Sequence, residues 1–186
     1  MVDIFVVRMI RAGLFALLLT TLAAFSPPSA QADPLPRERM AEIAMPTSLV
    51  KLSAKFGEGG SYWGGTPHSG LDFDGDTGAA IFAVADGIVR EVSIRGTYGR
   101  TITINHGDGL ASMYAHLSST DVKAGDQVSA GDRIARMGAT GKVSGSHLHL
   151  EIQVRGVPTD PYDFLLAANP GSASAPPAWA CRMYGC

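Results

Sequence analysis

The amino-acid sequence predicts a mainly β fold: a compact antiparallel sheet of the barrel or sandwich kind, with short loops and little helix. Short apolar or alternating runs recur along the middle of the chain, and Gly-containing turns separate them at short intervals. No long helical period appears in this part of the sequence. The predicted strands are residues 81–84, 87–94, 101–105, 112–117, 133–137 and 147–154.

Residues 1–32 have the pattern of a signal peptide. Two arginines precede the apolar run 12–25, and the small-residue triplet 30–32 supplies a cleavage site. The apolar run is shorter than the roughly 20 residues that a spanning helix needs. We therefore expect a secreted or cell-envelope protein whose mature chain begins near Asp33. A retained membrane anchor is the alternative, because residues 1–7 lengthen the apolar segment.

The remaining chain divides by composition into three parts. Residues 33–51 contain three prolines and are expected to form a linker or lead-in segment, and residues 52–168 are expected to form the folded domain. Residues 169–186 are rich in Pro, Gly, Ser and Ala and predict a flexible tail. The tail holds the two cysteines, Cys181 and Cys186, for which an oxidising compartment favours a small disulfide loop. Free thiols or pairing with another chain are the alternatives.

The charge balance argues against a nucleic-acid partner. Removal of residues 1–32 takes away two Arg and one Asp, so the 15 basic and 17 acidic residues become 13 and 16, a net charge of −3. A mildly acidic chain without clusters of Lys and Arg lacks the surface that phosphate backbones require. A mature chain of about 150 residues suits one domain, and we expect a monomer.

Four of the five histidines fall in three short motifs. These are His68-Ser69-Gly70-Leu71-Asp72, Tyr114-Ala115-His116-Leu117 and His147-Leu148-His149-Leu150-Glu151, each within or beside a predicted strand. Side chains two residues apart on a strand share a face. His147 and His149 can therefore face one centre, while Leu148 and Leu150 enter the core.

Zinc chemistry gives this pattern a meaning. Catalytic zinc takes three protein ligands of the imidazole or carboxylate type and keeps one position for water, whereas structural zinc usually takes four ligands, often thiolates. The two cysteines are distant in the sequence. A His, Asp, His set would serve amide hydrolysis. His68 or His116 alone is better explained as an ordinary polar residue, the H-x-H pair suits either interpretation, and spacing alone does not decide.

The sequence resembles the lysostaphin-type zinc endopeptidases, which cut peptide cross-links in bacterial cell walls. The resemblance covers about residues 56–165. Its motifs, in chain order, are Phe56-Gly57, HSGLDF, residues 84–89, Tyr98-Gly99, Tyr114 to Leu117, residues 122–131, residues 138–141, HLHLEI and Asp160-Pro161.

The resemblance implies that His68, Asp72 and His149 bind one Zn²⁺ per chain. His116 and His147 would handle protons beside it, in roles that the sequence does not separate. Tyr62 is expected in the substrate cleft, where its hydroxyl would help to stabilise an oxyanion, or where its ring would simply pack. His106 is assigned a structural place at a strand end.

Two positions depart from the family pattern. Ser146 stands where a proline commonly precedes the H-x-H motif, and Glu58 stands where a basic residue is frequent. Neither change removes a ligand. Glu58 makes the substrate preference less certain than the chemistry, and we expect bacterial peptidoglycan as the substrate and an activator or regulatory protein as a further partner.

Two other functions compete with this one. The first is a non-catalytic relative that acts as a cell-wall scaffold or activates another wall hydrolase. The second is a biotinyl or lipoyl carrier module, to which residues 85–89 and 122–131 are similar, but Lys123 precedes the turn and lacks the flanking pattern of such modules. A further hypothesis is that the lead-in covers the cleft and that Glu38 or Glu42 inhibits the site.

Overall fold

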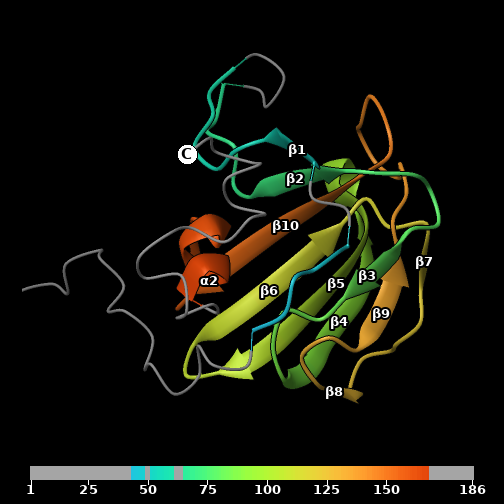
Figure 1. Ribbon diagram of the computed structural model, residues 1–186, viewed down its shortest axis with the longest axis vertical. Helices are drawn as coiled ribbons and strands as arrows, with labels where there is room; N and C mark the ends of the chain where they lie inside the picture. Colours follow the sequence, from blue (N-terminus) through green and yellow to red (C-terminus); the bar gives the residue numbers. More distant parts are fainter. Residues whose placement is uncertain (1–42, 49–50, 61–64, 168–186) are drawn as a thin grey trace, which may run out of the picture. The chain divides into compact units, whose positions relative to one another are not determined.

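Two antiparallel β-sheets make up most of the computed structural model, which describes residues 43–48, 51–60 and 65–167 (Figure 1). The larger sheet has eight strands in the order β1-β2-β10-β6-β5-β4-β8, and β11 pairs with β10. The smaller sheet has the order β3-β9-β7. The predicted mainly β, antiparallel fold is confirmed.

The bounds of the elements follow the Gly-containing turns of the sequence. The larger sheet consists of β1 (Lys51–Ala54), β2 (Leu71–Asp74), β4 (Gly87–Arg95), β5 (Gly99–Gly107), β6 (Leu110–Ala115), β8 (Gln127–Val128), β10 (His147–Val154) and β11 (Val157–Thr159). The smaller sheet consists of β3 (Ala80–Phe82), β7 (Ser119–Thr120) and β9 (Arg133–Arg136). A 3₁₀ turn, η2 (Gly96–Tyr98), joins β4 to β5, and one helix, α2 (Pro161–Ala167), follows β11.

Along strand β10, side chains alternate between the hydrophobic core and the opposite face of the sheet. Leu148, Leu150 and Ile152 are fully buried and belong to one hydrophobic cluster that also takes in residues of the smaller sheet. Because successive side chains point to opposite faces, His149 and Glu151 lie on the other side of the same strand. Core packing of the leucines therefore fixes where the polar residues between them are presented.

Strand β6 ends earlier than predicted. The sequence predicted a strand over residues 112–117, but β6 stops at Ala115, and His116 has a φ of 61°. The left-handed backbone is uncommon for a residue with a side chain and turns the chain out of the sheet. Pattern alone did not reveal it, because Leu117 is fully buried and continues the apolar alternation.

Part of the predicted linker packs on the domain. The Ala44 N–H donates to the Val84 carbonyl at 2.7 Å, and the Phe82 N–H donates to the Pro46 carbonyl at 2.8 Å. Ile43 and Met45 contact the hydrophobic cluster. The packed structure therefore extends at least to Ile43, ahead of the predicted boundary at residue 52.

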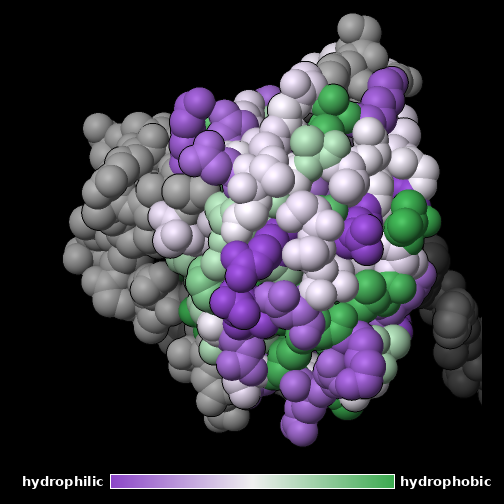
Figure 2. All heavy atoms as spheres, turned by 90° about the vertical axis from the view of Figure 1, so that its right-hand side faces the viewer, coloured by the Kyte–Doolittle hydropathy of each residue, from purple (hydrophilic) through white to green (hydrophobic). Residues whose placement is uncertain are grey.

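The exterior mixes hydrophilic and hydrophobic residues on the face seen in Figure 2, the side on which β7 and β9 lie in Figure 1. Large exposed hydrophobic side chains of the described part include Ile88, Ile94 and Val157, which occupy two different strands. Single exposed residues of this kind are ordinary. No helix in the described ranges is long and apolar enough to cross a membrane.

Several predictions concern residues outside the described ranges. They are the signal peptide, the greater part of the lead-in with Glu38 and Glu42, Tyr62, and the Cys181 and Cys186 pair.

Candidate metal centre

Two neighbouring strands and the loop before one of them bring three polar side chains together. Asp72 on β2 lies directly opposite His149 on β10 in the antiparallel register. Directly opposite residues on such a pair have neighbouring side chains on one face. His68 precedes β2, and its N–H donates to the Glu58 carbonyl at 2.8 Å, which joins the two ends of the connection between β1 and β2.

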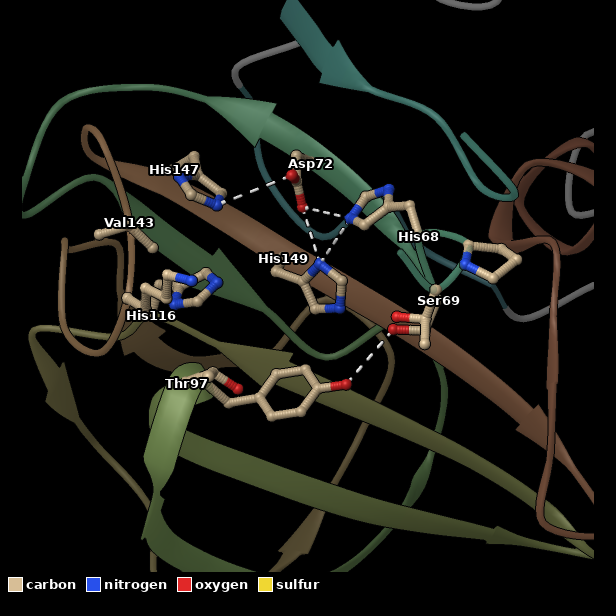
Figure 3. A pocket seen from close by; sticks show the side chains of 12 residues that line it. His68, Ser69, Asp72, Thr97, His116, Val143, His147 and His149 are labelled. Carbon is tan, nitrogen blue, oxygen red and sulfur yellow. Dashed lines mark hydrogen bonds and ion pairs between the residues drawn. The ribbon is translucent and has the colours of Figure 1, made fainter. Parts of the chain in front are cut away.

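The side-chain atoms of this group form a small triangle (Figure 3). His68 Nε2 lies 3.2 Å from Asp72 Oδ1 and 3.0 Å from His149 Nδ1, and His149 Nδ1 lies 2.7 Å from Asp72 Oδ1. All three residues are buried. Ligand atoms about 2.1 Å from a tetrahedral zinc ion lie about 3.4 Å apart. Small outward movements would therefore fit this triangle to zinc.

Hydrogen bonds on the outer side of each ring support the same interpretation. His68 Nδ1 donates to the Lys55 carbonyl at 2.8 Å, and His149 Nε2 lies 3.3 Å from Glu151 Oε1. In a neutral imidazole, a proton on the outer nitrogen leaves a lone pair on the inner one. The two inner nitrogens and Asp72 Oδ1 then offer three lone pairs to one point, which suits a cation.

Electrostatics at this centre favour positive charge. Burial opposes ionisation of Asp72, but hydrogen bonds and Coulombic attraction from His149 and His68 hold the pKa of Asp72 below its usual value. Burial also opposes the charged form of His149, yet hydrogen bonds to Asp72 and Glu151 raise the pKa of His149 to about 9. Without a metal ion, a protonated imidazole supplies the charge that the two carboxylates require.

Two further histidines line the same pocket. His116 Nδ1 donates to the Thr140 carbonyl at 2.9 Å, and His147 Nδ1 donates to the Gly145 carbonyl at 3.1 Å. Each bond leaves Nε2 for the pocket, and His147 Nε2 lies 3.8 Å from Asp72 Oδ2. The two ring centroids are 4.6 Å apart. Burial lowers the pKa of His116 to about 4, and the neighbouring histidines add to the effect, so the ring is neutral at pH 7.

Close backbone packing holds His116 in its left-handed conformation. Its N–H donates to the Tyr98 carbonyl at 2.9 Å. Gly99 and Gly141, both with positive φ, let η2 and the loop after β9 meet: a Cβ on Gly99 would lie 2.3 Å from the Thr140 carbonyl carbon. Only glycine tolerates both the approach and the backbone angle.

The pocket has a volume of about 280 Å³. It is lined by Thr66, Pro67, His68, Ser69, Asp72, Thr97, Tyr98, His116, Lys142, Val143, His147 and His149. Five residues that the sequence singled out thus lie together, although they come from three separate motifs. His106 lies elsewhere, as expected: its Nδ1 donates to the Asp86 carbonyl at 2.7 Å, and its Nε2 lies 2.7 Å from Ser112 Oγ.

A hydrogen-bonded group beside the triangle, made of Glu151, Ser69 and Tyr98, received no role from the sequence. Glu151 accepts hydrogen bonds from Ser69 Oγ at 2.5 Å and from the Tyr98 hydroxyl at 2.8 Å. Glu151 follows His149 by two positions, so strand alternation alone could have placed it on the same face. Tyr98 lies in a turn distant in sequence, and no local signal indicates its partner.

Fold and site together define a class: an antiparallel β protein that presents a buried His, Asp, His triangle and two further imidazoles to one pocket. The model of peptidase family M23 matches residues 66–161, which is more than half of the chain. The chain therefore belongs to peptidase family M23.

Sequence relatives include a wall enzyme and an activator. The chain is 39% identical over 111 residues to the peptidoglycan DD-endopeptidase ShyA of Vibrio cholerae, covering 60% of this chain and 25% of ShyA. It is 41% identical over 100 residues to the murein hydrolase activator NlpD of Escherichia coli, covering 53% of this chain and 26% of NlpD. The chain thus spans about a quarter of the length of these relatives.

Solved structures give the same grouping. A zinc-containing peptidase from Vibrio cholerae superposes with a TM-score of 0.60 at 32% identity, over 64% of this chain and 39% of that one. Lysostaphin from Staphylococcus simulans superposes with a TM-score of 0.62 at 30% identity, over 72% of this chain and 56% of that one. The expected resemblance to lysostaphin-type peptidases is confirmed.

Proposed function

We propose that the protein is an exported zinc-dependent endopeptidase that hydrolyses peptide cross-links of bacterial peptidoglycan. The convergent triangle of His68, Asp72 and His149 carries the proposal, because its three lone pairs call for a cation. Family membership and the similarity to ShyA support the hydrolase activity and the wall substrate. The pattern of residues 1–32 supports export to the cell envelope.

In this mechanism His68, Asp72 and His149 would hold the zinc ion. Zinc, when bound, lowers the pKa of water to about 7 and polarises a peptide carbonyl. His116 and His147 accept and return a proton at Nε2, since Nδ1 of each ring is already donated to a backbone carbonyl. The low pKa of His116 keeps its ring neutral and able to accept a proton at pH 7. Tyr62 would line the substrate cleft.

The test measures released fragments. Zinc-loaded protein is incubated with defined muropeptides, and mass spectrometry identifies the products and the bond that was cut. We expect stoichiometric zinc, cleavage of a cross-link, and loss of both in the His149→Ala variant. A control is Gln127→Ala, an exposed position on β8, which lies at the other end of the larger sheet from β2 and β10.

A second candidate function is activation of another wall hydrolase without catalysis, which the 41% identity to NlpD favours. The same samples distinguish the two candidate functions. Absence of cleavage with every wall type, together with faster digestion when a purified wall hydrolase is added, would support the activator. Cleavage by the protein alone, abolished by His149→Ala, would eliminate it.

A further inference from the structure

Glu151 is the carboxylate near the pocket that accepts the most side-chain hydrogen bonds. It is 3% exposed, and Oε1 accepts bonds from the Ser69 and Tyr98 hydroxyls and from His149 Nε2–H, while Oε2 accepts one from Gln153 Nε2 at 3.1 Å. A buried carboxylate is held in its charged form by such a set of donors.

Three separate segments meet at this carboxylate. Ser69 directly follows His68 in the loop before β2, and Tyr98 is the last residue of η2. The backbone carbonyl of Tyr98 also accepts the His116 N–H. Glu151 itself lies on β10. One side chain thereby ties the loop of one candidate ligand to the strand of another and to the turn that supports His116.

The imidazole of His149 is confined on several sides by these contacts. Its Nε2 faces Glu151, and the Tyr98 ring lies with its centroid 5.5 Å away at an angle of 54°. The backbone of Gly70 backs the ring so closely that an added Cβ would lie 3.0 Å from His149 Cε1. Rotation of the ring by half a turn would break the bond to Glu151 and remove Nδ1 from the triangle.

We propose that Glu151, held by Ser69 and Tyr98, is a positioning residue that fixes the orientation and tautomer of His149 so that Nδ1 is directed at the metal. This inference rests on the proposed zinc function and adds to it a role for three residues outside the ligand set. A carboxylate behind a ligating imidazole makes the imidazole a better ligand and fixes its proton on the outer nitrogen.

The test compares zinc affinities, measured by competition with a chromophoric chelator, and Co²⁺ absorption spectra of the full chain and its variants. Loss of such an outer carboxylate typically weakens metal binding 10- to 100-fold. We expect Glu151→Ala at the upper end of this range. Glu151→Gln should lose about tenfold, because its amide oxygen still accepts the His149 proton. The Co²⁺ bands should shift in both variants.

The matched control is Glu91→Gln. Glu91 lies in the same cross-strand row, opposite Thr103, which is opposite Met113, which is opposite Glu151. Glu91 pairs with Arg95 and contacts no candidate ligand. It should keep wild-type zinc affinity and the wild-type Co²⁺ spectrum. If the Glu151 variants fail to fold, Tyr98→Phe and Ser69→Ala remove one donor each and should still weaken zinc binding severalfold.

The outcomes separate the two proposals. Equal zinc affinity and equal Co²⁺ spectra in wild type and folded Glu151 variants would overturn the positioning role and leave the zinc function intact, as would an equal loss in Glu91→Gln. Absence of zinc binding by the wild-type protein would overturn the proposed function, and the positioning role with it.

Discussion

The imidazole of His149 has a carboxylate at each ring nitrogen: Asp72 Oδ1 lies 2.7 Å from Nδ1, and Glu151 Oε1 lies 3.3 Å from Nε2. Two buried negative groups around one ring stabilise a positive charge on it or beside it. Binding of a metal ion at Nδ1 must therefore displace a proton from His149 at neutral pH. The same residue thus connects metal binding to pH.

The stability of the metal-free protein should follow this arrangement. The folded pKa of Glu151, about 2, is below its usual 4.5, so its stabilising effect is present above about pH 4.5 and is lost as pH falls toward 2. The folded pKa of His149, about 9, exceeds its usual 6.5, so its effect is full below about pH 6.5 and is lost as pH rises toward 9.

The folded pKa of His116, about 4, lies below its usual 6.5, so its effect makes stability rise with pH between about 4 and 6.5. We therefore expect the melting temperature of the metal-free protein to be highest near pH 6.5 and to fall on both sides. Calorimetry across this range measures it. His149→Met should remove the decrease in melting temperature at alkaline pH and make the decrease at acid pH smaller. An alkaline fall that persists in His149→Met would contradict the assignment.

At the scale of elements, a buried series of hydrogen bonds connects β6 to β5 and to the segment that follows β3. The Tyr114 hydroxyl accepts the Val84 N–H at 2.8 Å and lies 3.1 Å from Ser112 Oγ, which in turn contacts His106. Tyr114 is fully buried, and burial raises its pKa to about 12. These hydrogen bonds satisfy the polar groups that are buried inside an otherwise apolar cluster.

Tyr114→Phe should therefore destabilise the fold by about 1–3 kcal/mol, because the Val84 N–H would remain buried without an acceptor. Urea unfolding measures the change. Thr103→Val provides the opposite case: in the described part of the chain Thr103 Oγ1 is buried without a hydrogen-bond partner. Its loss should be neutral or stabilising, and equal destabilisation by the two variants would refute the argument.

The contact between η2 and the loop after β9 should control His116. Gly99→Ala places a Cβ against the Thr140 backbone and should displace the turn. We expect a large loss of cleavage because His116 moves, and at most a severalfold loss of zinc affinity because Tyr98, a donor to Glu151, shifts with the turn. Kinetics and chelator competition on one sample distinguish these effects.

Gly78→Ala is the control for that substitution. Gly78 also has a positive φ, 95°, but an added Cβ would meet no atom within 4 Å. It carries the backbone strain of about 1–2 kcal/mol without the clash. Similar loss of cleavage in both variants would mean that general destabilisation, rather than displacement of His116, is responsible.

Alternation in the sequence predicted most of the strands and placed His147 and His149 on one face, whereas the resemblance to the lysostaphin-type peptidases supplied His68, Asp72 and His116. Alternation on β10 is strict, so the core positions of Leu148 and Leu150 determine the face of His147 and His149. The left-handed turn at His116 and the contact of Tyr98 with Glu151 were not predictable in this way. They depend on packing between segments that are far apart in the chain.

At the scale of the whole molecule, residues before β1 belong to the fold. Ile43 and Met45 pack on the cluster, and Thr47 is 1% exposed. A chain that begins at Leu52 should have a lower melting temperature than one that begins at Asp33, because it loses this packing and the backbone bonds to Val84 and Phe82.

The same pair of chains tests inhibition by the lead-in. Higher cleavage by the chain that begins at Leu52, at a temperature where both are folded, would support cleft coverage. Equal cleavage would reject it. An unchanged melting temperature would contradict the stabilising role of residues 43–47.

The opposite placement of Asp72 and His149 brings together residues 77 positions apart. Such long-range pairing forms late, because the closure of a long loop must precede its contacts. We therefore expect the triangle to be completed late in folding, when β10 joins β2. Zinc should then leave the folding rate almost unchanged and lower the unfolding rate. The zinc-loaded protein should therefore stay folded for longer than its melting temperature alone suggests.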